Sequence, residues 1–254
     1  MKVIWKGSIS FGLVNIPINL YSAIEARGIK TKLLYKKNLS PIRYKRWCDG
    51  CKKEVPWEDV VKGFEIGEDE FVVVSQKELN AMKPEKSKAV DIVEFIEIEQ
   101  IDPIYFNSHY YIGPEKADEK AYFLFKEILE QTEKMAIGQF IMHEKMHTCA
   151  IESYREGLLL TTLNYGYEIR DISEIKELKK KPNLSKQELE LAKKLIDKIT
   201  VKKFDINIFR DTFHDSLVTM LKKKEKGEKI MVEKKKEPKV KEENLIAALK
   251  ASLK

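Results

Sequence analysis

The chain has 254 residues, of which 43% are hydrophobic and 35% are charged, and its formal net charge is +6. This length allows one or two domains with a sizeable core, and no apolar run approaches the ~20 residues that a transmembrane helix requires. Three cysteines do not form a disulfide framework and residues 1–10 contain no apolar signal core, so we expect a cytoplasmic protein in a reducing environment.

The charge is strongly segregated along the chain. Residues 1–53 contain 12 Lys and Arg against two acidic residues, whereas residues 54–221 contain 23 against 33. Residues 222–242 are basic again, with ten Lys against five Glu. Segregated basic segments are typical of proteins that bind polyanions, although charge alone is equally compatible with solvated surface lysines.

Residues 3–24 predict β-structure, because apolar side chains alternate along them. The alternation shifts by one residue just after Gly12, which is typical of a β-bulge. Pro17 places this segment at a sheet edge or at a bulge. Further strands are favoured over residues 31–35, 64–74, 90–98, 104–112 and 136–169, and the second of these is a hairpin that turns at Gly67. Residues 40–57 are predicted to form a loop or knuckle.

Helices are predicted from capping boxes and from apolar periodicity. The S-x-x-E pairs at residues 75–78 and 185–188 are capping boxes, which predict a short helix after the first and a helix over residues 189–199 after the second. Residues 117–134 and 206–226 carry apolar side chains at helical spacing. Many strands followed by helices indicate an α+β or barrel-centred domain with a helical appendage.

The last part of the chain combines a charged segment with an apolar helix. Residues 226–242 are charged and contain no aromatic residue, which predicts a disordered linker. The following helix has one apolar stripe, and we expect this stripe to bind a partner's groove or the body of the chain itself. The stripe consists of Leu245, Ile246, Leu249 and Leu253.

The segment HEKMH, residues 143–147, matches the H-E-x-x-H zinc signature of metalloproteases. That chemistry needs both histidines on one helix face and a third protein ligand, whereas on a strand the two positions lie roughly 13 Å apart at the usual rise. Gly138 and the residues after His147 favour a strand, and no third-ligand motif follows. We therefore predict a hairpin tip, and a zinc-dependent hydrolase built on His143, Glu144 and His147 remains the alternative.

Cys48 and Cys51 form a single C-x-x-C pair, which is half of a structural zinc site. The alternative is a tight Asp-Gly turn flanked by two thiols. The third cysteine, Cys149, follows a β-rich run and is predicted to be a small core residue. We expect no other cofactor.

The most informative segment is a basic stretch interleaved with Tyr35, Tyr44 and Trp47. Cations and aromatic rings in this arrangement suit a nucleic-acid backbone, and because no recognition-helix or zinc-finger motif is present, we expect sequence-independent contacts. The candidate contact residues are Lys30, Lys32, Lys36, Lys37, Arg43, Lys45, Arg46, Lys52 and Lys53, with Lys6, Lys222, Lys223 and Lys224 as secondary candidates.

Several long segments are together characteristic of one family. They begin with IWKGSISFGLVNIPINLYSA and continue with RYKRWC, EVPWEDVVKGFE, LNAMKPEKSKAVDI and IDPIYFNSHYYIGPEK. GLLLTTLNYGYEIRD and FRDTFHDSLVTMLKKKEKG follow, so that the segments span about residues 2–230 in order. In these segments the chain closely resembles prokaryotic Ku proteins, the DNA-end binders of non-homologous end joining.

The resemblance implies an α+β fold with a β-barrel-centred core, a C-terminal helical arm and a flexible tail. It implies a two-fold homodimer whose basic channel threads a double-stranded DNA end without reading its sequence. It also implies that the chain has no catalytic residues and recruits a DNA ligase of end joining. We accordingly expect a nucleoid-associated protein that does not bind membranes, with a core at residues 1–200, an arm at 201–226, and a linker with a terminal helix at 227–254. A general nucleic-acid-binding module that does not require ends is a further alternative.

Overall fold

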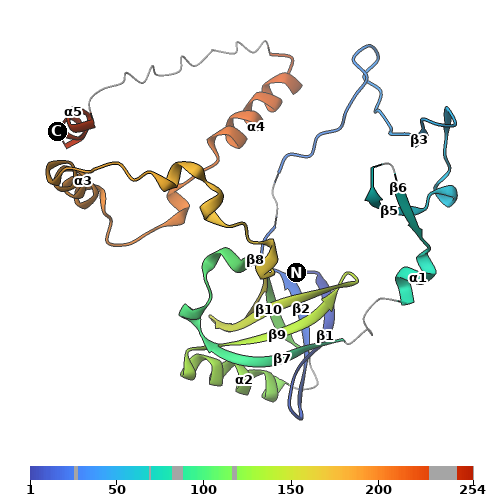
Figure 1. The fold of residues 1–254 in the computed structure, drawn as a ribbon, viewed down its shortest axis with the longest axis horizontal. Coiled ribbons are helices and arrows are strands. Elements are labelled where there is room, and N and C mark those ends of the chain that lie inside the picture. Colours follow the sequence, from blue (N-terminus) through green and yellow to red (C-terminus); the bar gives the residue numbers. More distant parts are fainter. Residues whose placement is uncertain (26–27, 69, 82–87, 116–118, 229–244, 254) are drawn as a thin grey trace. The chain divides into compact units, whose positions relative to one another are not determined.

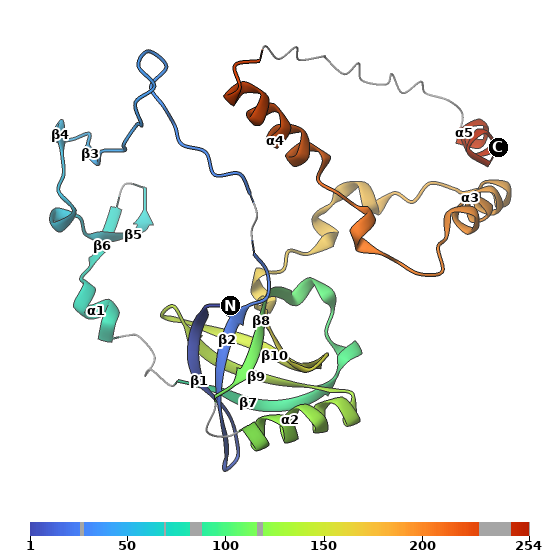
Figure 2. The same cartoon turned by 180° about the vertical axis from the view of Figure 1, so that it is seen from behind.

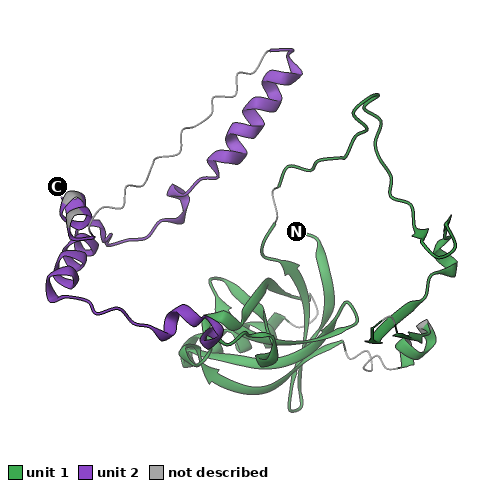
Figure 3. Ribbon diagram, turned by 45° about the horizontal axis from the view of Figure 1, so that its top comes forward, with its two compact units in different colours: residues 1–171 green, residues 172–254 purple. Residues whose placement is uncertain are grey.

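The computed structural model describes residues 1–25, 28–68, 70–81, 88–115, 119–228 and 245–253 (Figure 1). The chain divides into two compact units, residues 1–171 and residues 172–254 (Figure 3). The expected division into a core, an arm and a tail, with boundaries at residues 200 and 226, describes functional parts as well as packing. It stays a prediction. None of the helices in the described part of the chain is long and apolar enough to cross a membrane.

The first unit contains a closed barrel of seven strands, seen from two sides in Figures 1 and 2. Neighbouring strands follow the order β1-β2-β8-β11-β10-β9-β7, and a parallel pairing of β1 with β7 closes the barrel, whereas every other pairing is antiparallel. The predicted barrel-centred core is thereby confirmed. The strands are β1 (Val3–Phe11), β2 (Val14–Ser22), β7 (Ala89–Glu97), β8 (Phe106–Pro114), β9 (Lys134–Met142), β10 (Lys145–Tyr154) and β11 (Gly157–Leu163).

The bulge predicted after Gly12 is wrong, because the chain reverses there in a two-residue hairpin. Gly12 has a φ of 58° and Phe11 pairs with Val14 across the turn. In this register odd-numbered residues of β1 face even-numbered residues of β2, as in the buried pair Ile9 and Ile16. The shift in alternation therefore marked a reversal of the chain and not an inserted residue.

The barrel encloses the hydrophobic core, to which one helix adds. Helix α2 (Glu119–Thr132) lies below the strands in Figure 1, contacts β2, β9, β10 and β11, and buries Tyr122, Phe125 and Leu129, the face that the periodicity predicted. Burial of a side chain of this size stabilises a fold by about 1.5–3 kcal/mol. The remaining buried core residues come from the strands and include Ile18, Leu20, Val90, Phe140, Cys149, Ile151, Leu158 and Leu160. The assignment of Cys149 to the core is thereby confirmed.

Residues 23–88, here called the insertion, leave the barrel after β2 and return to it at β7. They contain two separate two-stranded sheets, and none of their described residues is buried. The predicted knuckle, the hairpin after Phe64 and the first capping box are confirmed, whereas residues 31–35 form only an isolated bridge between Leu34 and Pro41. The elements are β3 (Trp47–Cys48), β4 (Lys53–Glu54), the 3-10 helix η1 (Trp57–Asp59), β5 (Lys62–Gly67), β6 (Glu70–Val74) and α1 (Gln76–Ala81).

Short 3-10 turns connect the remaining elements of the first unit. They are η2 (Ile98–Gln100), η3 (Pro103–Tyr105) and η4 (Gly166–Glu168). Asp102 caps η3, because its side chain accepts a hydrogen bond from the Ile104 N–H. The predicted break before β8 is thereby confirmed.

The second unit is helical and buries none of its described residues. Helix α3 begins at the predicted capping box, whereas α4 begins six residues later than predicted, because Asp211 accepts the N–H of His214 and caps the helix there. The linker predicted to be disordered lies almost entirely outside the described residues. The elements are η5 (Ile172–Glu174), η6 (Lys176–Lys179), α3 (Lys186–Ile199), η7 (Ile206–Ile208), α4 (Thr212–Glu225) and α5 (Leu245–Leu253).

Candidate nucleic-acid interface

All nine primary candidates for DNA contact lie in the insertion, and all of their side chains are exposed. Two local turns gather several of them. The loop after Tyr35 is closed by a hydrogen bond from the Tyr35 N–H to the Ser40 carbonyl oxygen (2.8 Å), which leaves Lys36 and Lys37 at its tip. A second turn, between β3 and β4, carries Lys52, and Lys53 follows it as the first residue of β4. The structure thus places these cations on solvent-facing turns of one segment.

Lys45 and Arg46 precede β3 and have different surroundings. Lys45 Nζ lies 2.6 Å from Glu54 Oε2, and this hydrogen bond with the carboxylate charge raises the pKa of Lys45. Arg46 Nε donates a hydrogen bond to the Val55 carbonyl oxygen (3.2 Å), and its guanidinium carbon lies 5.2 Å from the centre of the Trp57 ring. Lys45 is therefore paired with an acid, whereas the charge of Arg46 is held against an aromatic face.

The secondary candidates lie outside the insertion. Lys6 is an exposed residue of β1, opposite Asn19 of β2. Lys222, Lys223 and Lys224 form the last turn of α4 in the second unit, where cations are favoured by the negative end of the helix dipole. A role of either group in DNA binding stays a prediction.

Cys48 and Cys51 lie at the tip of the β3–β4 hairpin. The Cys51 N–H donates to Cys48 Sγ (3.4 Å), and this bond, with further donors from the same turn, lowers the pKa of Cys48. Two thiols do not complete a zinc site, which takes four ligands. In the described part of the chain, no group of three or more His, Cys, Asp or Glu side chains is placed to hold a metal ion. By contrast, burial raises the pKa of the Cys149 thiol to about 12.

The HEKMH segment forms a hairpin tip, as predicted. β9 ends at Met142 and β10 begins at Lys145, so that only His143 and Glu144 form the turn. Both have positive φ (51° and 67°), which is typical of the type I′ turn of two-residue hairpins. His147 lies inside β10, and the centre of its ring lies 5.7 Å from the centre of the Phe140 ring, in a tilted arrangement. This backbone does not place the two histidines on one helix face, so the zinc-hydrolase alternative has no structural support.

Sequence reasoning missed the large apolar side chains that the insertion leaves exposed. Phe64 and Val72 pair across the β5–β6 hairpin, and both are roughly half exposed. Trp57 is 70% exposed although it is one of three tryptophans in the chain. The sequence predicted a hairpin over residues 64–74, but it did not indicate that the apolar side chains of this hairpin are exposed within the described chain. Other exposed apolar residues of the insertion include Leu33, Leu34, Ile42, Val60, Val61, Ile66, Phe71 and Val73.

Comparison with known proteins gives a consistent result. A family model described as the Ku70/Ku80 β-barrel domain matches residues 10–191. The chain is 37% identical over 254 residues to a protein of Archaeoglobus fulgidus and 36% identical over 255 residues to one of Bacillus subtilis, both named non-homologous end joining protein Ku. Each match covers all of this chain, and they cover 98% and 82% of the respective relatives. A relative from Heliobacterium modesticaldum with the same name is 36% identical, with 91% of its length covered.

Proposed function

Because the chain belongs to the family of the Ku70/Ku80 β-barrel domain, we propose that it binds double-stranded DNA ends in non-homologous end joining, as a homodimeric, ring-like clamp that does not read sequence. One observation carries the proposal within this chain. The insertion carries nine exposed Lys and Arg, most of them on loops and turns, and buries none of its described residues. Such a segment is suited to lie against another molecule.

The attachment of the insertion supports a clamp. β2, which precedes it, and β7, which follows it, both pair with β1, so both ends of the insertion are fixed to strands that flank one strand of the barrel. A segment that is anchored at both ends can enclose a polymer. A rod such as duplex DNA would then enter most readily at a free end.

The exposed apolar side chains of the insertion support a homodimer. Isolated two-stranded sheets are at best marginally stable in water, and contiguous apolar surface on a soluble protein is typical of an interface. A second copy presents the same surface, and a two-fold axis lets each copy cover the other. The face that carries Phe64 and Val72 is the part of this surface that we expect to be covered.

The positions of the cations support binding that does not depend on sequence. Contacts to phosphate oxygens carry no sequence information, and base readout requires an element that enters a groove. Most of the candidate cations lie on loops and turns, and the only α-helix within the described insertion, α1, contains none of them. We expect affinity to depend on salt, with a slope of about −0.9 in log K against log[salt] for each phosphate neutralised.

We further propose that the chain has no catalytic activity of its own and recruits a DNA ligase, with no metal or cofactor required. The second unit offers amphipathic helices for such a contact. The apolar stripe of α5 lies partly against α3, where Lys198 Nζ donates to the Leu253 carbonyl oxygen (2.9 Å). This contact favours the fold-back alternative for Ile246, Leu249 and Leu253, and binding of a ligase to the stripe, including the exposed Leu245, stays a prediction.

The decisive experiment compares linear and closed-circular DNA of one sequence in a gel-shift titration. The clamp should bind the linear form and leave the circle largely unbound. Ligation of the linear DNA after loading should trap the protein on the circle, since a closed ring cannot slide off. Equal affinity for both forms would favour the general nucleic-acid-binding module and would contradict the clamp.

A further inference from the structure

Arg46 is the cation of the insertion whose side chain is most fully oriented by its surroundings. The Val55 N–H donates to the Arg46 carbonyl oxygen (2.9 Å), and Arg46 Nε donates back to the Val55 carbonyl oxygen (3.2 Å). These two bonds fix both the backbone and the Nε atom of Arg46 to Val55, the residue that follows β4. The guanidinium carbon also lies over the face of the Trp57 ring, 5.2 Å from the ring centre.

The guanidinium keeps donors free in this arrangement. An arginine has five N–H donors, of which one is on Nε and four are on the two Nη atoms. Among the described residues, no hydrogen bond or ion pair engages the Nη atoms of Arg46. The fork that matches two oxygens of a phosphate diester is thus presented to solvent in a fixed direction.

Trp57 is placed to orient Arg46 and not to fill a core. It is the first residue of η1, which is closed by a hydrogen bond from the Val60 N–H to the Trp57 carbonyl oxygen (3.1 Å). Its side chain is 70% exposed, so it contributes little to packing within the chain. An aromatic face against a guanidinium attracts the cation and limits its rotamers.

Lys45, the neighbouring cation, differs from Arg46 in that its charged group is already paired with an acidic side chain. Its ammonium is paired with Glu54 at 2.6 Å, so its charge is already balanced within the hairpin. A phosphate would have to displace the carboxylate or accept its repulsion. The two adjacent cations are therefore not equivalent as phosphate ligands, although the sequence presents them side by side.

We propose that Arg46 forms a preorganised binding site for one phosphate of the DNA backbone, and that Trp57 is the positioning residue of this site. The proposal rests on the proposed DNA-end binding and names where on the insertion a phosphate is held. The ring and the Val55 carbonyl hold the guanidinium in one orientation before DNA arrives, so that less side-chain freedom is lost on binding.

The test measures the affinity of the full chain for a linear duplex by fluorescence anisotropy over a series of salt concentrations. Arg46→Ala should weaken binding about tenfold or more, as expected for the loss of a charge-assisted hydrogen-bonded pair. The salt slope should become shallower by about 0.9 for each phosphate that the variant no longer neutralises. Arg46→Lys should keep the slope but weaken binding, because a point charge replaces the planar fork.

The role of Trp57 is tested by coupling to Arg46. Trp57→Ala should weaken binding, and Trp57→Phe should restore most of the affinity because the ring face is retained. In the Arg46→Ala background, Trp57→Ala should have no further effect, since the side chain that it orients is gone. A purely structural role of Trp57 would instead give effects that multiply.

The matched control is Arg155→Ala, which removes an exposed arginine outside the insertion that is not a candidate for DNA contact and whose guanidinium carbon lies 5.2 Å from the centre of the Tyr154 ring. It should leave affinity and salt slope close to those of the wild type. The proposal is overturned if Arg46→Ala keeps the wild-type affinity and slope, or if the Trp57 and Arg46 effects multiply in full. If the phosphate site at Arg46 fails this test but the wild-type protein still prefers linear DNA over circular DNA, the proposed DNA-end binding is unaffected.

Discussion

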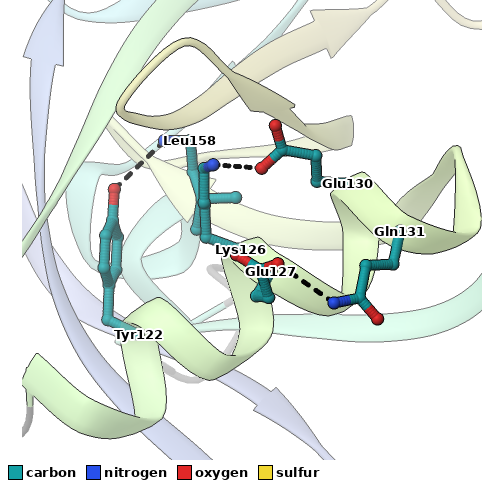
Figure 4. Close-up of polar contacts among 6 residues, drawn as sticks. All are labelled: Tyr122, Lys126, Glu127, Glu130, Gln131 and Leu158. Atoms are coloured by element: carbon teal, nitrogen blue, oxygen red, sulfur yellow. Dashed lines mark hydrogen bonds and ion pairs between the residues drawn. The ribbon is translucent and has the colours of Figure 1, made fainter.

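Tyr122 shows how one side chain joins α2 to the barrel. Its hydroxyl donates to the Ile112 carbonyl oxygen (2.6 Å) and accepts from the Leu158 N–H (3.0 Å), as Figure 4 shows for the latter. Ile112 and Leu158 are opposite residues of β8 and β11, so the hydroxyl fastens the helix to a strand pair. Next to the buried face of α2, Lys126 pairs with Glu130 although its side chain is only 14% exposed, and on the exposed side Gln131 donates to Glu127.

Tyr122→Phe should destabilise the fold without affecting DNA binding. The substitution keeps the buried ring but removes a hydroxyl that serves two main-chain groups, and unsatisfied buried polar groups cost about 1–3 kcal/mol each. The measurement is urea-induced unfolding followed by circular dichroism. Tyr154→Phe is the control, because that ring is 36% exposed, and it should change the free energy of unfolding by less than about 0.5 kcal/mol. An unchanged midpoint for Tyr122→Phe would contradict the role of the hydroxyl.

Among the individual residues, those with local partners were predictable and those with distant partners were not. The burial of Tyr122 follows from its place on the apolar face of a helix. Its two hydrogen-bond partners come from positions 10 and 36 residues away, and no local pattern indicates them. The same holds for Arg46, whose contact with Trp57 depends on how the chain turns after β4.

At the scale of elements, the helix termini are where sequence and structure agree most closely. Ser185 Oγ accepts from the Glu188 N–H (3.3 Å), and Glu188 Oε2 accepts from the Ser185 N–H (2.7 Å), so both groups at the start of α3 are satisfied reciprocally. A capping box is a purely local interaction, which is why four residues suffice to predict it. The late start of α4 was missed because its cap, Asp211, is not followed by Glu or Gln three residues later.

The start of α3 should depend on pH through Glu188. Hydrogen bonds from Ser185 to the ionised carboxylate lower the pKa of Glu188. For an acid whose folded pKa lies below its unfolded value, the stabilisation is present above the unfolded pKa of about 4.3 and is lost as the pH falls through the folded pKa. Hydrogen exchange of the amides of Ser185, Glu188 and Leu189, which the capping box protects, should therefore accelerate below about pH 4, after correction for the intrinsic rate.

The matched variant for this prediction is Ser185→Ala. Loss of the N-cap hydroxyl should weaken the helix by about 1 kcal/mol at neutral pH and should remove most of the pH dependence. The corresponding box at Ser75 and Glu78 belongs to the insertion and should be unaffected, so it serves as an internal control. Equal acceleration at both boxes in the Ser185→Ala variant would show that the effect is global unfolding.

At the scale of the whole molecule, periodicity predicted the strands and the resemblance to prokaryotic Ku proteins implied the barrel, but neither predicted that the insertion leaves its apolar side chains exposed. Strands that alternate in polarity close a sheet when each has a covered face, and the strands from β7 to β11 do so within one chain. The hairpin of β5 and β6 instead leaves Phe64 and Val72 exposed. Apolar residues in a strand indicate that their side chains are covered, but they do not show whether the same chain or another molecule covers them. The exposed apolar side chains of the insertion, which the sequence did not predict, are for this reason those that we assign to contact with a second copy.

This assignment makes a prediction about assembly. Phe64→Glu places a charge on the face of the β5–β6 hairpin that a second copy is expected to cover, and burying an unpaired charge in an interface is strongly unfavourable. The variant should be shifted toward monomer, with a dimer dissociation constant raised by about 30-fold or more for a loss of ~2 kcal/mol. Because Phe64 is exposed in the single chain, the barrel itself should unfold at the wild-type urea concentration.

Sedimentation equilibrium measures the dissociation constant, and gel shifts on linear DNA follow its consequence. Weaker dimerisation should lower the affinity for ends at low protein concentration, and a raised protein concentration should restore it, since mass action re-forms the dimer. Glu68→Ala at the turn of the same hairpin is the control, because it removes a solvent-facing charge at the tip and should leave assembly unchanged. A Phe64→Glu variant that dimerises like the wild type would mean that the insertion does not form the dimer contact, and its apolar surface would then have to be covered by another partner.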